Sequence, residues 1–365
     1  MYAIIMAGGT GTRLWPLSRK NKPKQNQCVL GDKTLLQATF ARIKKLVQVK
    51  NIIITTGRNC LNLICQELPG LSKSNFSTEP SRQDTAPALG LAGMLIEKRD
   101  PEAIMVNINS DAYVKDENEY RRILALGEKI TQENPEYTVA IGIEPQYPET
   151  GYGYIKKGRL FQKVRQTEKG KEDEIYYVDS FKEKPVLEKA KKFVESGQYL
   201  WNPTLFFWKV KTFIQLLKKY QPKMYAQLSR IQNAVGTKNY ASILEKEYKE
   251  IEPISIDYAI IEKNKKMLVI PAEFGWSDVG HWQSVQEILA NEKGQNVVQA
   301  KEFVSIDTEN SLIYAPDKKV VAVVGLKDMI VVDSPDALLV CPKSRAQEVK
   351  QVVKMLEEKG KGEYI

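Results

Sequence analysis

The residues best able to do chemistry stand close to the start of the chain. An apolar run at 2–7 leads into a glycine-rich turn, and two cations, Arg13 and Lys24, follow it. A buried strand that ends in glycines exposes backbone N–H groups that can converge on an anion, and nearby cations strengthen that attraction. The pattern predicts a site that holds a polyphosphate while its bonds are remade; a strand-to-helix turn without a ligand is the alternative. The glycines are Gly8, Gly9 and Gly11.

Two common phosphate-binding motifs are excluded by their spacing. The chain contains no Gly-x4-Gly-Lys-Ser/Thr string, so the turn is not the P-loop of ATPases. The dinucleotide motif Gly-x-Gly-x-x-Gly is not met either, because Leu14 stands where its last glycine belongs.

The elements that must position these residues alternate between strand and helix up to about residue 143. Repeated strand–helix–strand units predict an α/β fold, a Rossmann-like, mainly parallel (mixed) sheet with flanking helices. Ligands of such sheets bind at the carboxyl ends of the strands, so segments 8–11 and 109–111 can face one cleft. The expected strands are 52–56, 104–108 and 139–143, and the expected helices are 35–47 and 86–99.

The pattern changes from about Asn296, where short strands follow one another without helices between them. A helix at 344–359 ends the chain. We therefore expect two domains, a catalytic domain at 1–290 and a small β domain at 291–365. Strand edges of the small domain can pair between subunits, which predicts a homodimer. The expected strands are 303–307, 311–314, 320–324, 329–333 and 337–341.

Composition narrows the class of protein. The chain has 365 residues and a net charge of +9, but its lysines are spread out and often stand beside glutamate, which favours a solvated surface over a nucleic-acid site. No apolar run reaches the about 18 residues of a membrane span, and no secretion signal is recognisable. The 4 cysteines form no Cys-x-x-Cys pair and the single histidine, His281, is too little for zinc, so we expect reduced thiols and a cytoplasmic location.

Two aspartates are candidates to hold a metal ion. Phosphoryl transfer needs a cation that neutralises phosphate oxygens, and Mg²⁺ is usually held by one or two carboxylates plus the phosphates. Asp111 follows a buried strand, and Asp278 lies in a stretch at 274–282 rich in aromatic residues and glycine. For an isolated aspartate, a turn or a helix cap is the alternative.

The longer string Gly-Gly-x-Gly-Thr-Arg-Leu, with Pro-Leu and Pro-Lys after it, resembles the signature of the sugar-1-phosphate nucleotidyltransferases. Trp15, Ser18 and segment 23–25 are similar to the mannose-1-phosphate guanylyltransferase branch. The resemblance covers nearly the whole chain, with five or more motifs in the expected order. It implies a left-handed β-helix-like C-terminal domain, and it implies that Asp111 and Asp278 are ligands of Mg²⁺ or another divalent cation.

The resemblance also implies roles for three further groups of residues. The catalytic pair is Arg13 and Lys24. The nucleotide-binding residues are Gly8, Gly9, Gly11, Thr12, Glu79, Pro80 and Thr85. The sugar-phosphate residues are Glu149, Gly151, Glu183, Lys184 and Asn202, and Asp257 is a helix cap that supports the sugar side. Without the resemblance, segment 148–155 fits a hairpin turn and segment 182–185 fits a charged turn.

The implied reaction transfers GMP from GTP to α-D-mannose 1-phosphate and gives GDP-mannose and pyrophosphate. Four positions depart from the family pattern: Asn26 in place of phenylalanine, Gln83-Asp84 in place of Arg-Asn, Ala112 in place of histidine, and Pro203-Thr204 in place of Ser-Gly. The last departure lies where the sugar is expected, so a different hexose 1-phosphate is an alternative substrate. A catalytically silent paralogue that binds nucleotide sugars and regulates a partner is a further alternative.

Overall fold

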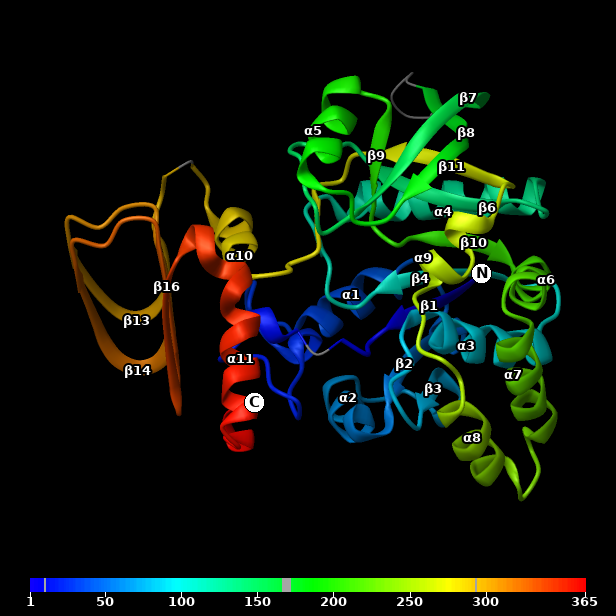
Figure 1. The fold of residues 1–365 in the computed structure, drawn as a ribbon, viewed down its shortest axis with the longest axis horizontal. Helices are drawn as coiled ribbons and strands as arrows, with labels where there is room; N and C mark the ends of the chain where they lie inside the picture. The colour runs from blue at the N-terminus through cyan, green and yellow to red at the C-terminus, as the bar shows by residue number, and fades with distance from the viewer. Residues whose placement is uncertain (10, 166–171, 293) are drawn as a thin grey trace. The chain divides into compact units, whose positions relative to one another are not determined.

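The computed structural model describes residues 1–9, 11–165, 172–292 and 294–365 (Figure 1). Contacts divide the chain into two compact units, each assembled from separate segments. Unit 1 contains Met1–Gly8, Phe40–Ser110 and Val114–Trp276, and unit 2 contains Gly9–Thr39, Asp111–Tyr113 and Ser277–Ile365. The division of function at residues 290 and 291 stays a prediction.

Unit 1 is built on a ten-stranded mixed sheet in the order β11-β8-β7-β9-β6-β10-β4-β1-β2-β3. Its β4-β1-β2-β3 part is parallel, with Ala3 opposite Ile52 and Val106. The α/β prediction is confirmed: the expected strands at 52–56 and 104–108 are β2 and β4 of this parallel part, and the one at 139–143 is β6 of the same sheet. The strands are β1 (Tyr2–Met6), β2 (Ile52–Gly57), β3 (Phe76–Glu79), β4 (Ile104–Asn109), β6 (Thr138–Ile143), β7 (Gly153–Arg165), β8 (Glu172–Lys182), β9 (Tyr199–Asn202), β10 (Phe206–Lys209) and β11 (Met267–Ala272).

Helices flank this sheet, and polar residues fix where they begin. Helix α3 begins at Asp84, whose carboxylate accepts a hydrogen bond from Thr85 N at 2.7 Å, and α4 begins at Asp116, which accepts from Asn118 and Glu119. Helices α3, α6 and α7 pack against one another (Figure 1). The helices of this unit include α2 (Leu61–Glu67), α3 (Thr85–Arg99), α4 (Glu117–Glu133), α5 (Leu187–Ser196), α6 (Val210–Tyr220), α7 (Pro222–Ala234), α8 (Tyr240–Lys249) and α9 (Ile256–Ala259).

Unit 2 contains a four-stranded sheet in which β13, β14 and β15 are parallel and β16 is antiparallel to β15 (Figure 1). The strands are β13 (Val297–Ile306), β14 (Leu312–Val324), β15 (Met329–Ser334) and β16 (Ala337–Pro342). The prediction of separate strands at 311–314 and 320–324 is wrong, because both belong to β14. The pairing with β13 shifts register between Ala300 and Glu302, and this irregularity lets one long strand continue.

The core of unit 2 contains residues from both the N-terminal and the C-terminal parts of the chain. Leu14 and Trp15 pack with the buried faces of β14, β15 and β16, including Leu312, Ile330 and Leu339. The expected terminal helix begins as a 3₁₀ helix at Lys343–Glu348 and continues as α11 (Val349–Glu358). The remaining elements of the chain include α1 (Leu35–Ile43), α10 (Trp282–Leu289), and the short strands β5 (Tyr113–Val114) and β12 (Trp276–Ser277).

Among the helices of the described residues, none has both the length and the apolar composition of a membrane span.

Gly127 in α4 provides a test of the packing between this helix and the sheet. A Cβ at Gly127 would lie 2.6 Å from Cε2 of Phe207, a fully buried ring of β10. Gly127→Ala should therefore lower the free energy of unfolding by about 1–3 kcal/mol, although alanine is the better helix former. Denaturant titration measures this change. Gly362→Ala, where a Cβ meets nothing within 4 Å, is the control, and an unchanged or raised stability of Gly127→Ala would contradict this packing.

Candidate active site

The glycine turn of unit 2 packs directly on the stem of Lys24. Gly11 has a φ of 63°, which lies in the left-handed region that favours glycine. A Cβ at Gly11 would lie 2.2 Å from Cβ of Lys24 and 3.0 Å from Oγ of Ser18. Both the backbone conformation and the space therefore require glycine here. Thr10 lies outside the described residues.

Three of the predicted residues meet at the Lys24 ammonium group. Lys24 Nζ lies 3.1 Å from Oδ2 of Asp111 and donates a hydrogen bond of 2.5 Å to the backbone carbonyl of Asp278. The Lys24 side chain is only 8% exposed. A buried ammonium group needs such partners, because its removal from water is costly. The structure thus brings together Lys24, Asp111 and Asp278.

A tight turn holds Asp278 in place. Gly280 N donates to Oδ1 of Asp278 at 2.9 Å, and a Cβ at Gly280 would lie 2.8 Å from the other carboxylate oxygen. Val279 has a φ of 49°, which is unusual for a β-branched residue, and its side chain is fully buried. Trp282 anchors the turn, because its Nε1 donates to the carbonyl of Trp15 at 2.9 Å. Packing therefore holds a strained backbone beside the candidate metal ligand.

The two aspartates fit a hard divalent cation. Carboxylate oxygens are the ligands that Mg²⁺ prefers, and it takes its other ligands from phosphates and water. The described residues contain no group of three or more His, Cys, Asp or Glu side chains that could hold a metal ion by itself. A metal ion held by Asp111 and Asp278 would therefore need phosphate or water oxygens as its other ligands.

Arg13 offers a second cation in unit 2. It lies in a 3₁₀ helix, Thr12–Leu14, that begins directly after Gly11. Its Nε is buried and has no hydrogen-bond partner among the described residues. An unsatisfied donor on a guanidinium group is suited to an anionic ligand.

In unit 1, Glu79 ends β3 in a buried position. Its Oε2 accepts a 2.7 Å hydrogen bond from the Tyr248 hydroxyl. Burial raises the pKa of Glu79 to about 7, although this hydrogen bond and the charge of Arg82 lower it. A Cβ at Gly8 would lie 3.9 Å from Oε1 of Glu79, so the predicted Gly8 and Glu79 are neighbours.

Thr85 joins the predicted nucleotide segment to the start of α9. Its Oγ1 accepts a hydrogen bond from Ile256 N at 2.8 Å, and Ala86 N donates to the Ile254 carbonyl at 3.1 Å. Pro80 is partly buried in the turn that follows β3. The hydroxyl of Thr85 therefore has a structural partner, which the sequence did not indicate.

The predicted sugar-side residues of unit 1 converge on two buried carboxyls. Asn202 Nδ2 donates to Oδ1 of Asp257 at 2.9 Å, and Lys184 Nζ donates to Oε1 of Glu183 at 2.5 Å. A Cβ at Gly153 would lie 2.5 Å from Oε2 of Glu183. Burial, followed by the charge of Glu183, raises the pKa of Asp257 to about 7.

The loop at 149–154 is held by hydrogen bonds within itself, and its Gly153 lies close to Glu183. Glu149 Oε1 accepts from Gly151 N at 2.7 Å, and the Glu149 carbonyl accepts from the Tyr154 hydroxyl at 2.8 Å. The Tyr152 ring packs edge-on against Trp201, 5.3 Å between centroids. Glu149 thus holds the loop through hydrogen bonds to Gly151 and Tyr154, and Gly151 itself is exposed.

The departure at Pro203-Thr204 carries backbone strain. Thr204 has a φ of 57°, a conformation that glycine adopts freely and that is uncommon for threonine. Asn107 holds this loop, because its Nδ2 donates to the Thr204 carbonyl at 2.5 Å and its Oδ1 accepts from Phe206 N at 3.1 Å. Sequence reasoning missed Asn107, although an asparagine within the apolar strand at 104–108 was a signal.

Comparison with known proteins gives matches along most of the chain. Residues 2–294 match the family model described as nucleotidyl transferase, and residues 301–356 match a MannoseP isomerase/GMP-like beta-helix domain. The chain is similar to a mannose-1-phosphate guanylyltransferase of Escherichia coli (strain K12), with 34% identity over 370 residues that cover 100% of this chain and 75% of the relative. It is also similar to the alginate biosynthesis protein AlgA of Pseudomonas syringae pv. tomato (strain ATCC BAA-871 / DC3000), with 33% identity and coverage of 100% and 73%.

A solved structure agrees over nearly the whole length. It is described as a mannose-1-phosphate geranyltransferase from Thermus thermophilus, and it is 32% identical. The TM-score is 0.85, and the match covers 98% of this chain and 99% of that one. The β-helix-like C-terminal domain predicted from the sequence is confirmed by the second family match.

The raised pKa of Glu79 predicts a pH dependence of stability. Between pH 4.5 and about 7 the native carboxyl keeps its proton while the unfolded one releases it, so the free energy of unfolding falls as pH rises. Glu79→Gln should make this slope shallower, because glutamine has no proton to lose. Denaturant titrations across this pH range measure the slope. Glu195→Gln, at an exposed side chain, is the control, and equal slopes for wild type and Glu79→Gln would contradict the prediction.

Proposed function

Because the chain belongs to the nucleotidyl transferase family, we propose that it transfers GMP from GTP to α-D-mannose 1-phosphate, giving GDP-mannose and pyrophosphate. The relatives named mannose-1-phosphate guanylyltransferase support this substrate pair. The observation that carries the proposal is the buried Lys24 ammonium, held by Asp111 and Asp278 beside the glycine turn.

The reaction depends on alignment of the two substrates and on neutralisation of phosphate charge, and it needs no general base. A phosphate oxygen of the sugar phosphate attacks the α-phosphorus of GTP in line. The bond between the α-phosphorus and the oxygen that bridges to the β-phosphate breaks, and pyrophosphate leaves with the electron pair of that bond. The nucleophile is already an anion, so no side chain has to remove a proton. Catalysis then comes from alignment and from neutralisation of charge on the phosphates.

The residues of unit 2 are proposed to act on the triphosphate. The backbone of Gly9, Gly11 and Thr12 would bind phosphate oxygens, and Lys24 and Arg13 would neutralise the charge that builds on the leaving pyrophosphate. Members of the family generally use a divalent metal, and we propose Mg²⁺ on Asp111 and Asp278. When bound, the metal polarises phosphate oxygens and lowers their mutual repulsion.

The residues of unit 1 are proposed to recognise the two ends of the reacting pair. Glu79, Pro80 and Thr85 would hold the guanosine, and the Gly8 backbone would bind the triphosphate. The sugar phosphate would be oriented by Glu149, Gly151, Glu183, Lys184 and Asn202, and Asp257 would position the Asn202 amide.

One observation favours a second candidate substrate. Pro203-Thr204 replaces the Ser-Gly of the family pattern, and Thr204 keeps a left-handed backbone despite its side chain. A β-branched residue in the loop that follows Asn202 changes what the sugar side can accept. A different hexose 1-phosphate with the same chemistry is therefore the alternative.

The oligomeric state is a further part of the proposal. The sheet of unit 2 exposes large apolar side chains, which favours a homodimer through this sheet. These side chains are Val304, Ile306, Val320, Val324, Leu338 and Val340. The expected cytoplasmic location stays a prediction.

A substrate panel tests the proposed function. Pyrophosphate release is measured with Mg²⁺ for GTP, ATP, UTP, CTP and dTTP, each against mannose, glucose and fucose 1-phosphate. We expect release with GTP and mannose 1-phosphate. Release with GTP and another sugar would move the assignment to the alternative substrate. No release with any pair, from protein that still binds GTP, would overturn the proposal in favour of a silent nucleotide-sugar-binding paralogue.

Lys24→Ala tests the role of the buried ammonium. Turnover should fall by about 100-fold or more, because a preorganised positive charge on the leaving group is lost. Steady-state pyrophosphate release measures turnover, and a melting curve shows that the variant is folded. Lys20→Ala is the matched control, since its exposed ammonium pairs with Glu357 at 2.9 Å. Near-normal turnover of folded Lys24→Ala would remove Lys24 from the catalytic machinery.

A further inference from the structure

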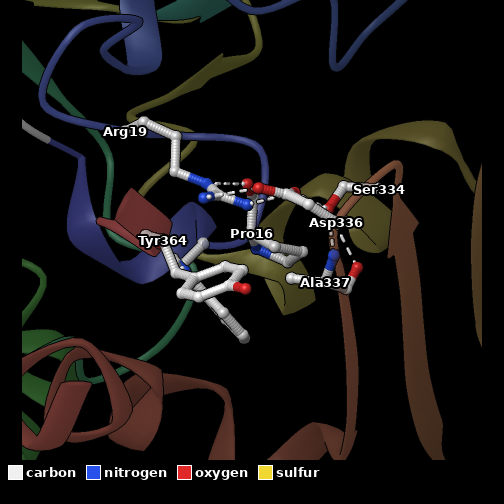
Figure 2. Close-up of polar contacts among 7 residues, drawn as sticks. Pro16, Arg19, Ser334, Asp336, Ala337 and Tyr364 are labelled. Atoms are coloured by element: carbon white, nitrogen blue, oxygen red, sulfur yellow. Dashed lines mark hydrogen bonds and ion pairs between the residues drawn. The ribbon is translucent and has the colours of Figure 1, made fainter. Parts of the chain in front are cut away.

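The turn between β15 and β16 carries Asp336, which forms an ion pair with Arg19 (Figure 2). Arg19 Nη2 lies 2.8 Å from Oδ1 of Asp336, and Arg19 Nη1 lies 3.3 Å from Oδ2. A two-point contact of this kind fixes orientation as well as distance. The Arg19 side chain is 12% exposed and the Asp336 side chain is 50% exposed, so the arginine is largely buried while its partner remains at the surface.

The turn that carries Asp336 is itself held by Ser334. Ser334 Oγ lies within hydrogen-bond distance of Asp336 Oδ1, at 3.2 Å, and of the Ala337 carbonyl, at 2.8 Å (Figure 2). It also accepts from Ala337 N at 3.2 Å. The carboxylate therefore projects from a constrained hairpin turn rather than from a loose loop.

Arg19 also forms hydrogen bonds with the backbone that precedes Lys24 in the chain. Its Nε donates to the Pro16 carbonyl at 2.6 Å, and its own backbone exchanges two hydrogen bonds with Lys22, of 3.0 and 3.1 Å. Pro23 restricts the next step of the chain, and Lys24 follows it. Arg19 is thus hydrogen-bonded to the backbone of Pro16 and Lys22, shortly before Lys24 in the chain.

Two other contacts join the same segment to the C-terminal part of unit 2. Trp15 Nε1 donates to the Tyr364 carbonyl at 2.8 Å, and the Tyr314 hydroxyl donates to the Cys28 carbonyl at 3.4 Å. These contacts lie on either side of the stretch from Arg19 to Lys24. The segment from Trp15 to Cys28 is therefore held near both ends, and Asp336 contacts it at Arg19 between them.

We propose that Asp336 is a positioning residue for the transfer reaction, and that the C-terminal sheet sets the place of the Lys24 ammonium through Arg19. This inference rests on the proposed function of Lys24. Loss of the carboxylate frees the turn at 16–22 and lets Lys24 move relative to Asp111. Because the ammonium matters most when charge builds on the leaving group, kcat falls more than KM for GTP changes.

Asp336→Ala tests this inference in the full chain. Its kcat for pyrophosphate release should fall about tenfold, with a smaller change in KM for GTP and an unchanged melting temperature. Asp336→Ala should add little further loss of kcat to Arg19→Ala, since both variants remove the same contact. Arg345→Ala is the matched control, because Arg345 pairs with Glu348 only three residues away and should leave kcat unchanged.

Each outcome decides the matter. Wild-type kcat in folded Asp336→Ala overturns the inference, and so does a loss of activity that only follows a loss of folded protein. If Asp336→Ala does not fold, Asp336→Asn takes its place, and wild-type kcat in that variant overturns the inference. If the wild type releases no pyrophosphate with any substrate pair, the proposed function fails separately. Calorimetry with inorganic pyrophosphate then decides, since equal affinity of wild type and Asp336→Ala overturns the positioning role.

Discussion

Burial of one ammonium group constrains the whole of unit 2. Lys24 Nζ is removed from water and is stabilised by the Asp111 carboxylate and the Asp278 carbonyl. Lys24 and its two partners come from three separate segments, so these segments must be brought together before the charge can be buried. Gly11 allows the glycine turn to reach the lysine stem, and Gly280 leaves room for the Asp278 carboxylate. The Trp282 contact to Trp15 closes the arrangement.

Unit 1 contains buried carboxyl groups that no ammonium group among the described residues contacts directly. There, Glu79 and Asp257 are buried carboxyls whose pKa values rise to about 7, so both take up protons near neutral pH. Tyr248 and Asn202 donate hydrogen bonds to them. Beside the buried Asp257, the sugar-side residues also include an ion pair, since Lys184 Nζ lies 2.5 Å from Oε1 of Glu183.

Three of the four departures from the family pattern lie at positions with a strained backbone or with buried polar atoms that lack partners among the described residues. Thr204 and Asp84 both have positive φ, at 57° and 69°. Asn26 is 1% exposed, and neither polar atom of its amide has a hydrogen-bond partner among the described residues. Buried polar atoms without partners and strained backbones are destabilising. Such costs persist where surrounding packing holds them, and the Asn107 contacts do this for Thr204.

The sequence alone determined the local features of this protein. Apolar runs located β2, β4 and β6, and the spacing of Gly8, Gly9 and Gly11 indicated a phosphate turn, because strand burial and turn geometry depend on neighbouring residues. Tertiary structure decided the rest. The pairing of Lys24 with a backbone carbonyl, the raised pKa of Asp257, the continuity of β14 and the Arg19–Asp336 contact involve partners far apart in the chain. Packing selects such partners, and no local pattern of residues encodes them.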